Sequence, residues 1–261
     1  MILDLDDLEN SFFKLKQESL MLGLVINPIL EKYDLVKKEK LELCQIGKFL
    51  LNVDSHIEII EKPQPPNPDF ILKLDNLKIG LEHTRIINGA NSQRYFSIVN
   101  LLDNAELLYR EKYPNTNVSA SFRFMNDELI YKKNEKVDLA IQICEFVFQA
   151  TQGIFINKPV FIEDIKIQPH STVSFDYIEN DFSSDKLTKE ELLRSIKIKE
   201  IKLEKYYSKN NEINEFWLVL MIGSLSSVSF EIDDKVDYRS NSIFDKVFLV
   251  MDFDEEIIQI K

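Results

Sequence analysis

The sequence predicts an α/β fold whose amino-terminal segment is helical and whose central and carboxyl-terminal segments supply strands. Apolar residues recur at helical spacing over residues 4–22. Two short apolar segments flank the turn-forming pair Asp75-Asn76, which is typical of a β-hairpin. Residues 215–223 are of strand length and consist, after Glu215, of an unbroken apolar run that ends at Gly223, which favours a central strand. The chain has 261 residues, 44% of them hydrophobic, which is ample for one large α/β domain with or without a subdomain.

Composition excludes several classes of protein. The net charge of −12 argues against a protein that coats nucleic acid by bulk electrostatics. The same net charge is compatible with a local basic face beside a metal site. There is no apolar run of about 18 residues, so we expect no membrane span. The first residues are acidic, unlike a secretory signal, and Cys44 and Cys144 form no Cys-x-x-Cys pair. We therefore expect a reduced, cytoplasmic protein.

The amino-terminal segment, residues 1–54, is expected to form two helices. The first covers residues 4–22, Gly23 to Pro28 break the pattern, and the second covers about 29–52. Residues 55–61 fit either a first strand or the end of the second helix.

The hairpin around Asp75-Asn76 carries the strongest chemical signal. If these two residues form the loop, Leu74 faces Leu77, and the same count places Asp69 opposite Glu82. Directly opposed carboxylates repel each other, and a bound divalent cation would explain the pair. A slip of one residue would send Glu82 to the other face, so the prediction depends on this register.

Helix and strand patterns alternate after the hairpin. A helix is expected over about 93–112, a strand over 117–125 and an apolar helix over 139–150. Residues 158–168 and 171–178 resemble a hairpin that turns at Pro169-His170. We interpret about 117–185 as an inserted α/β segment.

A long helix is expected over about 188–209, because Thr188 and Glu191 form a capping-box pattern. Lys199 and Lys202 share one of its faces with Ile196 and Tyr206. Lysines in this pattern are either a solvated basic face or part of a site. Strands are then expected at 215–223 and 245–251, with an edge strand at 257–260.

The segment Pro68-Asp69-Phe70, followed by Ile79-Gly80-Leu81-Glu82-His83-Thr84, resembles the hairpin of the PD-(D/E)xK phosphodiesterase superfamily. This resemblance implies a restriction-endonuclease-like αβββαβ core with a mixed central sheet in residues 55–261. In that family the acidic pair holds Mg²⁺, and a lysine two residues after the second acid helps to activate water. Here that position is Thr84, and the resemblance suggests that Lys199 or Lys202 takes over its role.

The resemblance also implies the ligands of a Mg²⁺ or Mn²⁺ ion. Asp69, Glu82 and the backbone carbonyl of His83 would bind it, whereas alternation along the strand would turn the His83 side chain away. An acidic residue before the hairpin often completes such a site. Glu58 and Glu61 are the candidates by position, and either is equally compatible with a surface carboxylate.

Three functions remain open. The first is a Mg²⁺-dependent nuclease, acting on DNA in preference to RNA through attack by a water molecule, with Asp69, Glu82 and Lys199 or Lys202 as catalytic residues. The second is a nuclease-like fold without catalysis that binds a partner, which Thr84 and the acidic charge favour. The third is an unrelated α/β domain. A homodimer or a protein partner is compatible with each.

Overall fold

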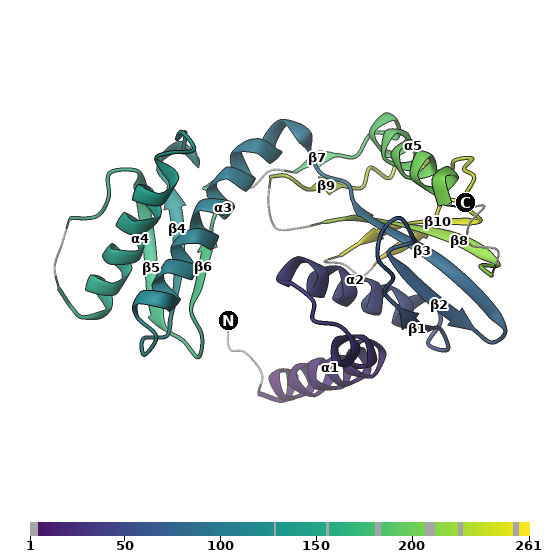
Figure 1. The fold of residues 1–261 in the computed structure, drawn as a ribbon, viewed down its shortest axis with the longest axis horizontal. Coiled ribbons are helices and arrows are strands. Elements are labelled where there is room, and N and C mark those ends of the chain that lie inside the picture. Colours follow the sequence, from purple (N-terminus) through teal and green to yellow (C-terminus); the bar gives the residue numbers. More distant parts are fainter. Residues whose placement is uncertain are drawn as a thin grey trace. The chain divides into compact units, whose positions relative to one another are not determined.

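The computed structural model describes residues 5–127, 129–154, 157–180, 184–206, 212–223, 227–252 and 256–261 (Figure 1). Over these residues the chain is an α/β protein with five α-helices, a mixed six-stranded sheet and two smaller sheets. None of these helices is both long and apolar enough to cross a membrane. The chain divides into two compact units: unit 1 is Met1–Ile86, Lys186–Ser224 and Glu231–Lys261, and unit 2 is Ile87–Asp185 and Leu225–Phe230.

Unit 1 is built on the six-stranded sheet, whose strand order is β1-β2-β3-β8-β10-β11. The strands are β1 (Glu58–Glu61), β2 (Phe70–Leu74), β3 (Leu77–Arg85), β8 (Glu215–Ile222), β10 (Lys246–Met251) and β11 (Ile257–Gln259). The first three pair antiparallel, β3, β8 and β10 are parallel to one another, and β11 is an antiparallel edge strand. The predicted central and edge strands are confirmed, and residues 58–61 form a strand rather than the end of a helix.

The register of the β2–β3 hairpin is the predicted one. Leu74 pairs with Leu77, and Phe70 pairs with Leu81. Asp75 has a left-handed φ of 51°, which aspartate tolerates better than most residues. Local turn chemistry therefore fixes which residues of the two strands share a face.

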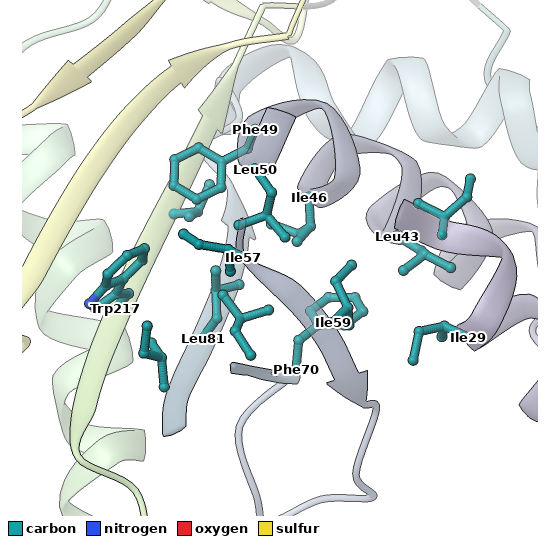
Figure 2. Packing of buried hydrophobic residues seen from close by; sticks show 14 of the residues in the cluster. Ile29, Leu43, Ile46, Phe49, Leu50, Ile57, Ile59, Phe70, Leu81 and Trp217 are labelled. Atoms are coloured by element: carbon teal, nitrogen blue, oxygen red, sulfur yellow. The ribbon is translucent and has the colours of Figure 1, made fainter. Parts of the chain in front are cut away.

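Two helices, α1 (Leu5–Lys32) and α2 (Lys37–Val53), cover one face of this sheet (Figure 1). Figure 2 shows Ile46, Phe49 and Leu50 of α2 packed beside Leu81 and Trp217 of the sheet. All five side chains are almost completely buried. Burial of these apolar side chains, worth about 1.5–3 kcal/mol each, holds α2 on the sheet.

The predicted break at Gly23 to Pro28 is wrong, because α1 continues through it and the chain leaves the helix after Lys32. Ile26 and Ile29 of this segment are buried in the core shared with α2. Their burial outweighs the cost of a glycine and a proline inside a helix.

The helix α5 (Lys189–Tyr206) lies on the face opposite α2 (Figure 1). Its predicted capping box is present: the Glu191 amide donates to the Thr188 hydroxyl at 3.2 Å, and the Thr188 amide donates to the Glu191 carboxylate at 3.2 Å. The cap fixes the start of α5 and hence the rotation at which its later residues face the sheet.

Unit 2 contains α3 (Gly89–Lys112), α4 (Lys136–Thr151) and a three-stranded sheet of order β5-β4-β6. Its strands are β4 (Val118–Phe124), β5 (Ile162–Pro169) and β6 (Ser174–Tyr177). The predicted hairpin of β5 with β6 is wrong, since both pair with β4, β5 antiparallel and β6 parallel. Phe122 and Phe124 of β4 are fully buried, and a central position gives them neighbours on both sides.

The boundaries of unit 2 differ from those of the insertion expected at about 117–185. Unit 2 begins at Ile87 and so includes α3, because α3 packs against α4 and β6 in a common core. The third sheet has two strands, β7 (Asp185–Lys186) and β9 (Phe230–Glu231).

Candidate metal and catalytic site

The two carboxylates of the hairpin meet at the beginning of β2. Asp69 directly precedes Phe70, the partner of Leu81, so Asp69 lies beside Glu82 across the two strands. Gly80 keeps this region compact, since a Cβ atom there would lie 2.9 Å from the Phe216 ring and 3.0 Å from Pro68. Pro68 can therefore pack over Gly80, and this packing limits the backbone conformations of the segment that leads into Asp69.

Lys199 of α5 reaches both carboxylates. Its Nζ atom lies 2.6 Å from Glu82 Oε2 and 3.3 Å from Asp69 Oδ2. It also donates to the backbone carbonyl of His83 at 2.7 Å. The three N–H donors of the ammonium group thus have three oxygen partners, all supplied by the hairpin.

This cluster is largely sequestered from solvent. The side chains of Lys199 and Glu82 are 8% and 2% exposed, whereas that of Asp69 is 36% exposed. Burial alone would lower the pKa of Lys199, but the carboxylates of Asp69 and Glu82 outweigh it and raise that pKa above its usual value. Lys199 is therefore a cation at neutral pH, and solvent reaches the cluster chiefly from the side of Asp69.

His83 contributes its backbone to the site and its side chain to the opposite face. Its amide donates to Asp69 Oδ2 at 2.9 Å, while its carbonyl accepts from Lys199. Its neighbour on β8 is Val219, which belongs to the core under α2, so alternation places the imidazole there too. Burial lowers the pKa of His83 to about 4. The side chain thus points away from the site, as alternation predicts, and is neutral at pH 7.

The oxygen atoms of this cluster fit a hard divalent cation. Two carboxylates and a backbone carbonyl converge on one point, and the positively charged ammonium group of Lys199 occupies that point. Oxygen sets with one or two carboxylates suit Mg²⁺, which keeps several waters among its ligands. Among the described residues no group of three or more His, Cys, Asp or Glu side chains could hold a metal ion, and the third oxygen that these residues bring to this point is the His83 carbonyl.

The two other acidic candidates lie on β1. Glu61 pairs with Ile71, two residues from Asp69, after a register shift between Ile59 and Glu61. Glu58 pairs with Lys73, nearer the hairpin turn. Both side chains are exposed. The pairing therefore places Glu61 nearer than Glu58 to the carboxylate pair, but neither joins the pair in a group of three side chains that could hold a metal ion.

The structure distinguishes the two candidate lysines of α5. Lys199 is 7% exposed and bonded to the hairpin, whereas Lys202, one turn later, is exposed. Thr84, two residues after Glu82, is half-buried on β3 beside Leu220. The cation beside the carboxylates thus comes from the helix and not from the strand.

Sequence reasoning did not single out Glu200, which anchors the lysine-bearing helix. Its Oε1 atom accepts from the Ser242 hydroxyl at 2.9 Å and from the Ile243 amide at 3.1 Å. Burial opposes ionisation, but these hydrogen bonds and the one from Lys197 hold the pKa of Glu200 below its usual value. Ser242 and Ile243 lie more than 40 residues away along the chain, so no local pattern could have identified these two partners.

Comparison of the chain with protein-family models, with curated proteins and with solved structures found no match.

Proposed function

We propose that the chain is a metal-dependent nuclease of the restriction-endonuclease-like fold, which hydrolyses phosphodiester bonds of nucleic acid, DNA in preference to RNA. The observation that carries the proposal is the convergence of Asp69, Glu82 and the His83 carbonyl on the ammonium group of Lys199. In this arrangement the acidic pair of the hairpin has a lysine beside it, although Thr84 occupies the position at which the family motif has its lysine.

The order of elements in unit 1 supports this fold. The series α2, β1, β2, β3, α5 and β8 follows the αβββαβ order, with α3 to β7 between β3 and α5. The first three strands form an antiparallel sheet and β8 joins it parallel to β3. This topology brings the helix with Lys199 over the strand with Glu82.

Each residue then has a defined task. Asp69, Glu82 and the His83 carbonyl hold Mg²⁺ or Mn²⁺, which when bound would supply Lewis-acid stabilisation of phosphate and a water of lowered pKa. Lys199, whose pKa is raised, would place a positive charge beside the phosphoryl oxygens, on which negative charge develops. The exposed edge of Asp69 is the side from which a phosphate can approach.

The test is cleavage of labelled DNA and RNA, single- and double-stranded, with Mg²⁺, with Mn²⁺ and with EDTA. Wild type should cleave only with metal, and Asp69→Asn, Glu82→Gln and Lys199→Met should each lower the rate by about 100-fold or more. Glu58→Gln is the matched control, since it removes an exposed carboxylate of the same sheet. Unchanged cleavage in Asp69→Asn and Glu82→Gln would contradict the assignment.

One observation favours a second function, a nuclease-like fold that binds a partner without catalysis. The Lys199 ammonium already supplies a cation to the buried Glu82 carboxylate and to the partly exposed Asp69 carboxylate, so both have a counterion without a metal. A wild type that neither binds Mn²⁺ nor cleaves any of the four substrates would support this function.

A further inference from the structure

The ammonium group of Lys199 lies at the position that a metal ion would need. A Mg²⁺ ion binds oxygen ligands at about 2.1 Å. Lys199 Nζ lies 2.6 Å from Glu82 Oε2 and 2.7 Å from the His83 carbonyl oxygen. A metal ion bound to these same atoms would occupy the space of the ammonium.

Charge adds to this steric conflict. Like charges a few ångströms apart in a partly buried site repel each other strongly, because the protein screens them less than water does. The Lys199 ammonium lies 2.6 Å from Glu82 Oε2 and 3.3 Å from Asp69 Oδ2, so a divalent cation held by the same two carboxylates would lie directly beside this positive charge.

We infer that Lys199 and the divalent cation compete for the oxygens of Asp69, Glu82 and the His83 carbonyl, so that metal binds only when the ammonium withdraws. The inference rests on the proposed function, since it takes these oxygens as the metal ligands. Lys199 is thereby both the group that acts on phosphate and the group that limits metal binding. Removing its charge should strengthen metal binding while it weakens cleavage.

The test is calorimetric titration of Mn²⁺ into the full chain, without nucleic acid, for wild type, Lys199→Met and Lys199→Gln. We expect both variants to bind Mn²⁺ at least tenfold more tightly than wild type. Lys202→Met is the matched control: it removes the same charge from an exposed position of α5 and should change the affinity less than twofold. Lys199→Gln keeps an N–H donor beside Glu82, so the affinity can still be measured with this variant if Lys199→Met does not fold.

The possible results separate the inference from the proposed function. Unchanged or weaker Mn²⁺ binding in both Lys199 variants overturns the inference, and cleavage by wild type in the same preparation leaves the proposed function standing. No Mn²⁺ binding by any variant, together with no cleavage, overturns both. Tighter binding in the Lys199 variants, with no cleavage by wild type, supports the competition and contradicts the nuclease.

Discussion

Lys199 of α5 and Glu82 of β3 are 117 residues apart in the chain, yet their charged atoms lie 2.6 Å apart in a buried ion pair. Such a pair is strongly coupled, because losing one partner leaves the other charge buried without its counterion. The region between them includes nearly all of unit 2. The pair therefore joins the two halves of unit 1 on either side of that insertion.

A double-mutant cycle should reveal this coupling in the free energy of unfolding. Glu82→Gln and Lys199→Met should each destabilise the fold by about 3 kcal/mol, and the double variant by at least 2 kcal/mol less than their sum. Urea denaturation in the presence of EDTA measures all four proteins. Additive losses would show that the contact carries no net interaction.

Glu200, whose hydrogen bonds hold α5 in place, gives a second prediction. Glu200→Gln should lower the free energy of unfolding by about 2 kcal/mol, because the charged acceptor of the Ser242 hydroxyl and the Ile243 amide is lost. Glu204→Gln, at an exposed position of the same helix, is the control and should cost no more than about 0.5 kcal/mol. Equal losses would indicate that the hydrogen bonds of Glu200 do not stabilise the helix.

The buried imidazole of His83 should make stability depend on pH. Its pKa is about 4 in the fold, against an ordinary value of 6.5, and burial is the main cause. Between these values the unfolded chain binds the proton and the folded chain does not. Above pH 6.5 the protonation of His83 therefore does not reduce the free energy of unfolding. As the pH is lowered from 6.5 towards 4, it reduces this free energy by up to about 3 kcal/mol.

The matched variant for this prediction is His83→Phe, which keeps an aromatic side chain without an ionisable group. Urea denaturation of both proteins between pH 4 and pH 7 isolates the histidine, because the carboxylates that titrate in this range are common to both. The difference in unfolding free energy should shift in favour of His83→Phe as the pH falls. A constant difference would mean that the imidazole is not sequestered in the fold.

Local chemistry explains which parts of the fold could be predicted. The hairpin register follows from the turn at Asp75-Asn76, and the start of α5 follows from Thr188 and Glu191, since each involves neighbouring residues. The choice between Lys199 and Lys202 could not be made in this way. Both occupy one helical face, and only the packing of α5 on β3 buries the first and exposes the second.

The wrong predictions share one physical cause. Gly23 and Pro28 weaken a helix locally, and Pro169-His170 favours a turn. In both regions, however, packing against residues that are distant in the sequence determines the structure. Ile26 and Ile29 keep α1 helical by packing with α2, and β4 separates β5 from β6 because its buried face needs neighbours on both sides. A single sequence shows local preference but not the partner that outweighs it.

The close packing of α1 against α2 gives a last prediction. A Cβ atom at Gly47 of α2 would lie 2.6 Å from Ile26 Cγ2 and 2.6 Å from Leu22 Cδ1, closer than side-chain contacts allow. Gly47→Ala should therefore lower the free energy of unfolding by about 1–3 kcal/mol, although alanine favours a helix by about 1 kcal/mol over glycine. Gly23→Ala is the control, because its Cβ would meet only the Asn27 side chain, at 3.4 Å, and it should stabilise the protein. Thermal or urea denaturation of both variants distinguishes the two effects, and a stabilising Gly47→Ala would mean that the helices are not in close contact there.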